Sequence, residues 1–143
     1  MAQAEHKQVV SVDAEQFFKA ITQYENYPKF VDGCKGIQVE RKGPGEARTH
    51  YKMNIMRDVE YTLDHKEFPD QKKMEWNLVK SDMIKKNTGR WELTSMGAGK
   101  TEVKYSIEIE FNIPVPGFVL NQLVKSSIPS MIRGFEKQAK TLT

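Results

Sequence analysis

The residue types that carry out most enzyme chemistry are present in this chain, but their spacing does not support catalysis or metal binding. The histidines, His6, His50 and His65, lie far apart, and none has a partner at a metal-ligand spacing. The single cysteine, Cys34, excludes an intramolecular disulfide and fits a reducing compartment. The sequence therefore predicts no metal, no cofactor and no catalytic residue, although distant residues can still assemble into a triad.

One stretch, TSMGAGKT at residues 94–101, comes close to a phosphate-binding loop. The motif requires glycine where Thr94 stands, and a helix should follow its lysine, whereas Thr101 begins a strand-like alternation. Without a helix N-terminus, the amides and the dipole that hold phosphate are missing. We therefore predict a hairpin turn.

Composition and charge narrow the class of protein. Of the 143 residues, 38% are hydrophobic and 29% charged, which is typical of a globular domain, and the net charge of +3 is dispersed. No segment is long enough for a membrane span, and the N-terminus has no apolar signal core. We expect one cytoplasmic domain over 1–143 that does not bind DNA. Peripheral membrane contact stays open.

Alternating apolar and polar residues predict antiparallel strands with one covered face. The clearest case is 101–111, and a short first strand is expected over 7–12. The other alternating segments are 37–40, 47–55, 59–64, 74–78 and 90–93. No Gly or Pro marks the boundary near 56–58. The sequence thus predicts one sheet of about seven strands.

Two regions have a helical period instead. Asp13 and Gln16 form a capping-box pattern ahead of a short helix, which must break near Pro28. The connector QYENYPKFVDGC, residues 23–34, is unusually apolar, so we expect it to pack on another element. Apolar residues recur at helical spacing from 118 to 142 and predict a helix of about 25 residues, kinked at Pro129.

These elements favour an α+β architecture. Since only the last helix is long enough to span the sheet, we expect a curved antiparallel sheet wrapped around it, with two short helices after the first strand closing one end. The inward face is rich in Tyr and Trp, and His65 shares its parity. Periodicity leaves two interpretations open, a packed core or a partly hollow site for an apolar ligand.

The order of elements and three stretches resemble a known superfamily. VDAEQFFKAITQYENYPKFVDGCKGIQV (12–39), TGRWEL (88–93) and VPGFVLNQLVKSSIPSMIRGFEKQA (115–139) resemble START-like helix-grip (SRPBCC) proteins, in the branch of coenzyme Q-binding proteins, polyketide cyclases/dehydrases and ribosome association toxins. Quinone-binding members carry Leu-Pro-Trp-Cys where this chain has Val-Asp-Gly-Cys at 31–34. The fold implied is the helix grip.

The inward parity and the resemblance together define a candidate site. The expected cavity lining is Tyr51, Met53, Tyr61, His65, Trp76, Trp91, Tyr105, Ile107, Val124, Ser127 and Met131. The resemblance places the entrance at Tyr27, Phe30, Val31 and Phe118, which would act as a plug or as a gate.

Three functions follow as hypotheses. The first is non-catalytic binding of a lipid or an isoprenoid quinone such as coenzyme Q, with Tyr51, Tyr105, His65 or Ser127 orienting a polar head. The second is a cyclase or dehydrase, which would need a Tyr–His pair in the cavity or an inward arginine, for which Arg41 has the parity. The third is a ribosome-interacting module, supported by the lysine pairs 72–73 and 85–86.

Overall fold

The computed structural model describes residues 2–54, 58–112, 114–118 and 127–142. Within these residues seven strands form one sheet in the order β1-β7-β6-β5-β4-β3-β2, and every neighbouring pair is antiparallel. The strands are β1 (Ala2–Val10), β2 (Cys34–Gly43), β3 (Glu46–Asn54), β4 (Asp58–Phe68), β5 (Lys73–Ser81), β6 (Ile84–Ser95) and β7 (Thr101–Phe111). The predicted α+β class and strand number are confirmed.

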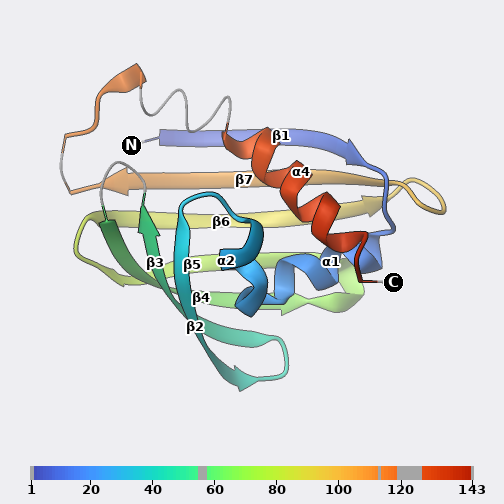
Figure 1. The fold of residues 1–143 in the computed structure, drawn as a ribbon, viewed down its shortest axis with the longest axis horizontal. Helices are drawn as coiled ribbons and strands as arrows, with labels where there is room; N and C mark the ends of the chain where they lie inside the picture. The colour runs from blue at the N-terminus through green and yellow to red at the C-terminus, as the bar shows by residue number, and fades with distance from the viewer. Residues whose placement is uncertain (1, 55–57, 113, 119–126, 143) are drawn as a thin grey trace.

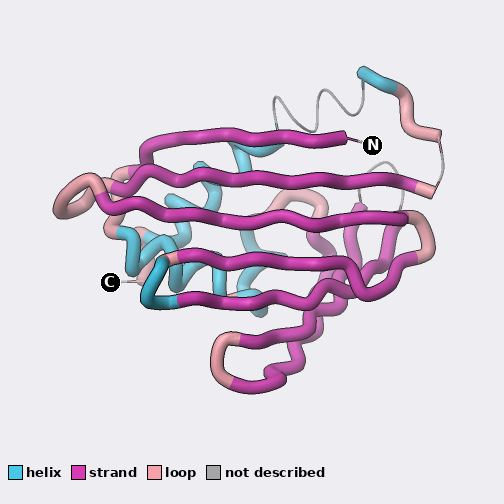
Figure 2. The backbone as a smooth tube through the Cα atoms, turned by 180° about the vertical axis from the view of Figure 1, so that it is seen from behind, coloured by secondary structure: helices cyan, strands magenta, loops and turns pink. Residues whose placement is uncertain are grey.

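The helices lie on one face of this sheet, as Figures 1 and 2 show from opposite sides. They are α1 (Ala14–Thr22), the 3-10 turn η1 (Tyr24–Asn26), α2 (Tyr27–Phe30) and α4 (Ile128–Ala139), whereas the 3-10 turn η2 (Pro69–Gln71) connects β4 to β5. The hairpin of β2 and β3 bends away from the other strands (Figure 1). The sheet therefore curves around the helical layer. None of the described helices is long and apolar enough to cross a membrane.

The first strand is longer than its composition predicts. β1 begins at Ala2 rather than at Lys7, because it pairs with β7 continuously from Ala2 opposite Ile109 to Val10 opposite Thr101. Its early residues are held by backbone pairing and need no apolar alternation of their own. The first strand of the chain and the last strand are thereby joined at one edge of the sheet.

The near-phosphate-loop stretch is a hairpin turn between β6 and β7, as predicted. Met96 N donates to Lys100 O at 3.0 Å, which closes the turn. The Asp13 carboxylate, at the N-cap of α1, accepts a hydrogen bond from Gly99 N at 2.6 Å. In addition, Asp13 N donates to Gln16 Oε1 at 3.3 Å, the reciprocal bond of a capping box. Asp13 thus caps the helix and anchors the turn.

The described C-terminal helix covers the sheet with one apolar side. Its buried residues are Ile128, Ile132, Phe135 and Ala139. Pro129 stands in its first turn, where a missing N–H costs nothing. Residues 119–126 of the predicted longer helix lie outside the described residues, so the kink at Pro129 stays a prediction.

The apolar connector packs against this helix. The Tyr27 and Phe30 rings lie edge-on to Phe135, with centroids 5.2 and 4.9 Å away. Tyr24 is fully buried, and its Oη donates to Glu67 Oε2 at 2.6 Å. The expected packing of the connector on another element is confirmed for Tyr24, Tyr27 and Phe30, whereas Pro28 is exposed.

Candidate ligand-binding cavity

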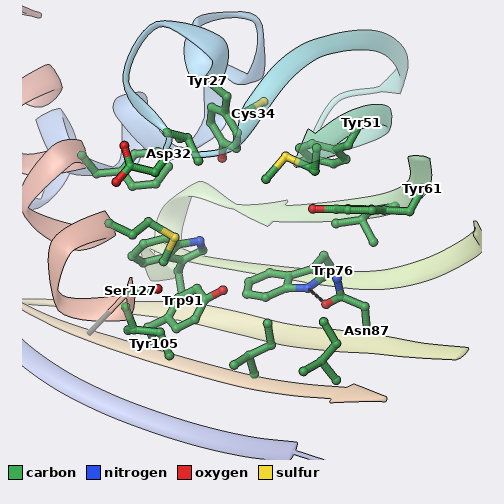
Figure 3. A pocket seen from close by; sticks show the side chains of 18 of the residues that line it. Tyr27, Asp32, Cys34, Tyr51, Tyr61, Trp76, Asn87, Trp91, Tyr105 and Ser127 are labelled. Atoms are coloured by element: carbon green, nitrogen blue, oxygen red, sulfur yellow. Dashed lines mark hydrogen bonds between the residues drawn. The ribbon is translucent and has the colours of Figure 1, made fainter. Parts of the chain in front are cut away.

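A cavity of about 280 Å³ lies between the inward face of the sheet and the two helices α2 and α4. Figure 3 shows it from close by. Most of its wall is aromatic or aliphatic, with a small number of polar groups among them. This is the usual character of small-molecule sites in proteins.

Most of the residues predicted from the sequence lie in this wall. The structure brings together Tyr51, Met53, Tyr61, His65, Trp76, Trp91, Tyr105, Ile107, Ser127 and Met131, and also Tyr27, Phe30 and Val31. Val124 lies outside the described residues. Phe118 is 74% exposed and is not among the described lining residues. That any of these residues binds a ligand stays a prediction.

The sequence reasoning missed other lining residues, which are Asp32, Cys34, Leu63, Met74, Asn87, Ile109, Phe111, Ile128, Ser130 and Phe135. Several of them carried a signal, because Leu63 and Met74 share the inward parity of their strands. Asn87 also has the parity of Trp91, four residues on. The residues of β6 that precede Arg90 are polar or glycine back to Lys85, so no apolar alternation there indicates that Asn87 faces inward.

Buried tyrosines give the cavity an aromatic and electrically neutral wall. Tyr51 stacks on Tyr61 with ring centroids 4.9 Å apart, and Tyr105 packs against Trp76 and Trp91 at 5.5 and 4.7 Å. Burial raises the pKa of Tyr51, Tyr61 and Tyr105 well above the usual value for a phenol. These three phenols are therefore un-ionised at neutral pH.

His65 is held neutral by its surroundings, and its contacts fix its tautomer. Its Nδ1 lies 3.2 Å from Met74 Sδ, and its Nε2 lies 3.1 Å from Tyr51 Oη and 3.0 Å from Thr49 Oγ1. Because a thioether can only accept a hydrogen bond, Nδ1 carries the proton and Nε2 accepts. Burial lowers the pKa of His65 to about 3. The imidazole is therefore an uncharged, hydrogen-bonded part of the wall.

Arg41 does not reach the cavity, contrary to its inward parity. It stands near the end of β2, beside a register irregularity between Arg41 and Gly43, and its side chain is 47% exposed. Its guanidinium donates to Glu67 Oε2 at 2.9 Å and to Thr22 O at 3.0 Å, and it lies over the Tyr24 ring. Arg41 therefore ties the edge of the sheet to the end of α1.

Asn87 and Trp76 form the other polar pair of the wall. The Trp76 indole Nε1–H donates to Asn87 Oδ1 at 2.9 Å, as the dashed line in Figure 3 marks. Asn87 is only 6% exposed.

Asp32 and Ser127 lie at the opposite end of the view in Figure 3, and both are exposed. The cavity thus has a solvent-facing mouth beside α2 and the start of α4.

The Trp76 ring packs directly on the backbone of Gly89, where there is no room for a side chain. A methyl group at this position would overlap both the Trp76 ring and the Ser106 carbonyl oxygen. We expect Gly89→Ala to lower the free energy of unfolding by about 1–3 kcal/mol, because the packed ring and the backbone must shift. Chemical denaturation followed by circular dichroism measures this.

Gly36→Ala is the matched control, because an added methyl at Gly36, also on a strand, meets no atom within 4 Å. Its stability should change by less than about 0.5 kcal/mol. Equal effects of the two substitutions would show that the Gly89 contact is not the cause.

The fold and the cavity place the chain in the helix-grip class of START-like domains, in which a curved antiparallel sheet encloses an apolar site against a C-terminal helix. The chain belongs to the family described as polyketide cyclase / dehydrase and lipid transport, whose model matches residues 10–136. Among the described residues, no group of three or more His, Cys, Asp or Glu side chains could hold a metal ion.

Relatives of known name are distant. The chain is 21% identical over 140 residues to the ribosome association toxin RatA of Escherichia coli K12, covering 98% of this chain and 88% of RatA. It is 22% identical over 145 residues to the persistence and stress-resistance toxin PasT of Escherichia coli O6:H1, with the same coverage of 98% and 88%.

Solved structures share the fold more closely than the sequence. The Zhui aromatase/cyclase of Streptomyces sp. R1128 superposes with a TM-score of 0.85 at 10% identity, covering 97% of this chain and 93% of that one. A START superfamily protein of Mycobacterium smegmatis also gives 0.85, at 19% identity and 99% coverage of both chains. At such identities the likeness establishes the fold alone.

Proposed function

We propose that this protein is a non-catalytic carrier of a hydrophobic small molecule in the cytoplasm, and that the molecule sits between the sheet and α4. The observation that carries this proposal is the cavity of about 280 Å³ with its aromatic wall and neutral polar groups. Burial of apolar ligand surface would supply most of the affinity. The family description, which includes lipid transport, supports the same class of ligand.

The volume of the cavity limits how much of a ligand can be enclosed. At about 280 Å³ it lies at the lower end of small-molecule sites. A lipid or an isoprenoid quinone would therefore place one ring or one chain segment inside and lead its remaining tail out past Phe30, Val31 and Met131, which are half-buried at the mouth. Peripheral contact with a membrane, where such ligands are collected, is part of this proposal.

Native mass spectrometry of protein purified from its own host, followed by organic extraction, tests the proposal. We expect a stoichiometric apolar adduct that is released on denaturation. Ile107→Trp should abolish the adduct, because the larger ring fills the cavity, whereas Val79→Trp introduces the same indole at a position that is 41% exposed and should keep it. An adduct that survives Ile107→Trp in a folded protein would contradict this site.

One observation favours a cyclase or dehydrase as a second candidate. Tyr51 and His65 form a hydrogen-bonded pair in the cavity wall, which is the arrangement such an enzyme would need. Against it, both nitrogens of His65 are engaged with protein atoms, and a pKa of about 3 makes it a weak base at neutral pH. Tyr51→Phe separates the two candidates, since it should abolish turnover of a polyketide-like chain but keep the bound adduct.

A ribosome-interacting role is less favoured by the geometry, although RatA carries that name. Three of the four paired lysines contact carboxylates on the sheet, and these pairs are Lys73–Glu75, Lys85–Glu110 and Lys86–Glu108. Phosphate contacts would have to compete with those ion pairs. Co-sedimentation with ribosomes that weakens as salt is added would support this role.

A further inference from the structure

We infer that the cavity selects neutral apolar ligands that carry a hydrogen-bond acceptor oxygen, such as a ketone, ester or quinone carbonyl, and that the Asn87 amide binds this oxygen. The inference rests on the proposed function and adds the chemical class of the ligand. Two independent features carry it, namely the orientation of the Asn87 amide and the charge state of the wall.

The orientation of Asn87 follows from its partner. An indole N–H can only donate, so the atom that faces Trp76 Nε1 at 2.9 Å is the amide oxygen. The two Nδ2 hydrogens therefore point away from Trp76. In the described part of the chain they have no hydrogen-bond partner, although Asn87 is only 6% exposed.

The unpartnered donor opens onto the cavity rather than into packed protein. Asn87 lines the cavity, and its Nδ2 is not among the described side-chain atoms that are fully enclosed and lack a hydrogen-bond partner. A donor in this position is satisfied only by something inside the cavity. Because Nδ2 can only donate a hydrogen bond, the ligand atom that it recognises is an acceptor.

The wall offers no positive charge to an anionic ligand. No lysine or arginine is among the described lining residues. Burial lowers the pKa of His65, so that group does not supply a cation at neutral pH. The carboxylate of Asp32 stands at the mouth and repels an incoming anion. A fatty acid carboxylate would therefore be buried without a counter-charge, which is strongly unfavourable.

A matched pair of ligands tests this selectivity. Methyl nonyl ketone and decanoate carry the same nonyl chain and the same carbonyl, and they differ by a methyl group in place of the charged oxygen. By isothermal titration calorimetry at pH 8, we expect the wild-type protein to bind the ketone at least about tenfold more tightly than decanoate. This comparison requires no variant and does not depend on the folding of one.

The double variant Asn87→Leu/Trp76→Phe tests the anchor. Replacing both partners by apolar groups leaves no orphaned indole N–H, so the wall should stay folded. We expect the ketone to bind about 3- to 10-fold more weakly to this variant. Naphthalene, which is neutral and has no acceptor oxygen, reports the change in the apolar wall alone, so the ketone should lose more affinity than naphthalene does.

The results distinguish a failure of the selectivity assigned to Asn87 from a failure of the proposed function, which is binding of a hydrophobic molecule. If neither the ketone nor naphthalene binds the wild-type protein, the proposed function itself is overturned. If the ketone and decanoate bind equally well, or if the double variant keeps full affinity for the ketone, the hydrophobic site stands and the selectivity assigned to Asn87 is overturned.

Discussion

Phe135→Ala is expected to lower the free energy of unfolding by about 3–5 kcal/mol, the range for removing a buried aromatic ring. Phe135 is 2% exposed. Its ring joins three elements, because it contacts Phe17 of α1, Tyr27 and Phe30 of α2, and Trp91 of β6, with centroid distances between 4.9 and 6.3 Å. Urea denaturation followed by circular dichroism measures the loss.

Lys137→Ala is the matched control, because it truncates an exposed side chain two residues further along the same helix. It should change stability by no more than about 0.5 kcal/mol. Phe135→Leu should recover part of the lost stability, since it refills most of the space. A cost of less than 1 kcal/mol for Phe135→Ala would show that this ring does not hold α2 and α4 onto the sheet.

Most strands were predictable because they have one covered face and one solvent-exposed face, so apolar and polar residues alternate in the local sequence. β6 shows the limit of this reasoning. Its first half, residues 84–89, has no apolar residue after Ile84, yet it pairs with β7, and Asn87 stands opposite Ile109. The neighbouring strand, and not the local sequence, fixes that half as strand. The candidate donor Asn87 was missed for this reason.

The cavity itself could not be predicted, because its volume depends on how side chains from distant elements meet. Parity places Tyr51 and His65 on the same face, but not at hydrogen-bond distance. That distance depends on the register of β3 against β4, in which Thr49 stands opposite Leu63. Arg41 has inward parity too, yet it lies near the end of the edge strand β2, where its long side chain reaches solvent and Glu67. Alternation therefore predicts which face of the sheet a side chain lies on, but not where along that face it lies relative to the cavity.

The buried His65 is expected to make the protein sensitive to acid. Its pKa is about 3 in the folded protein and near 6.5 when unfolded, so between these values the unfolded chain binds more protons. Stability therefore falls as the pH drops through 6.5, by up to about 1.4 kcal/mol per pH unit, and His65 contributes little to the slope above about pH 7.5. From pH 6.5 to 5 we expect a loss of about 2 kcal/mol, measured by urea denaturation at each pH.

This window separates His65 from the carboxylates. Hydrogen bonds and ion pairs lower the pKa of Glu40, Asp58 and Asp64, so these groups stay ionised down to pH 5 and affect stability only at lower pH. His65→Gln should therefore flatten the profile between pH 6.5 and 5. Thr49→Val removes a hydrogen bond to His65 but no titrating group, so it should lower stability at every pH and keep the slope. A slope that persists in His65→Gln would show that another group takes up the proton, and the neutral tautomer assigned to His65 would lose its support.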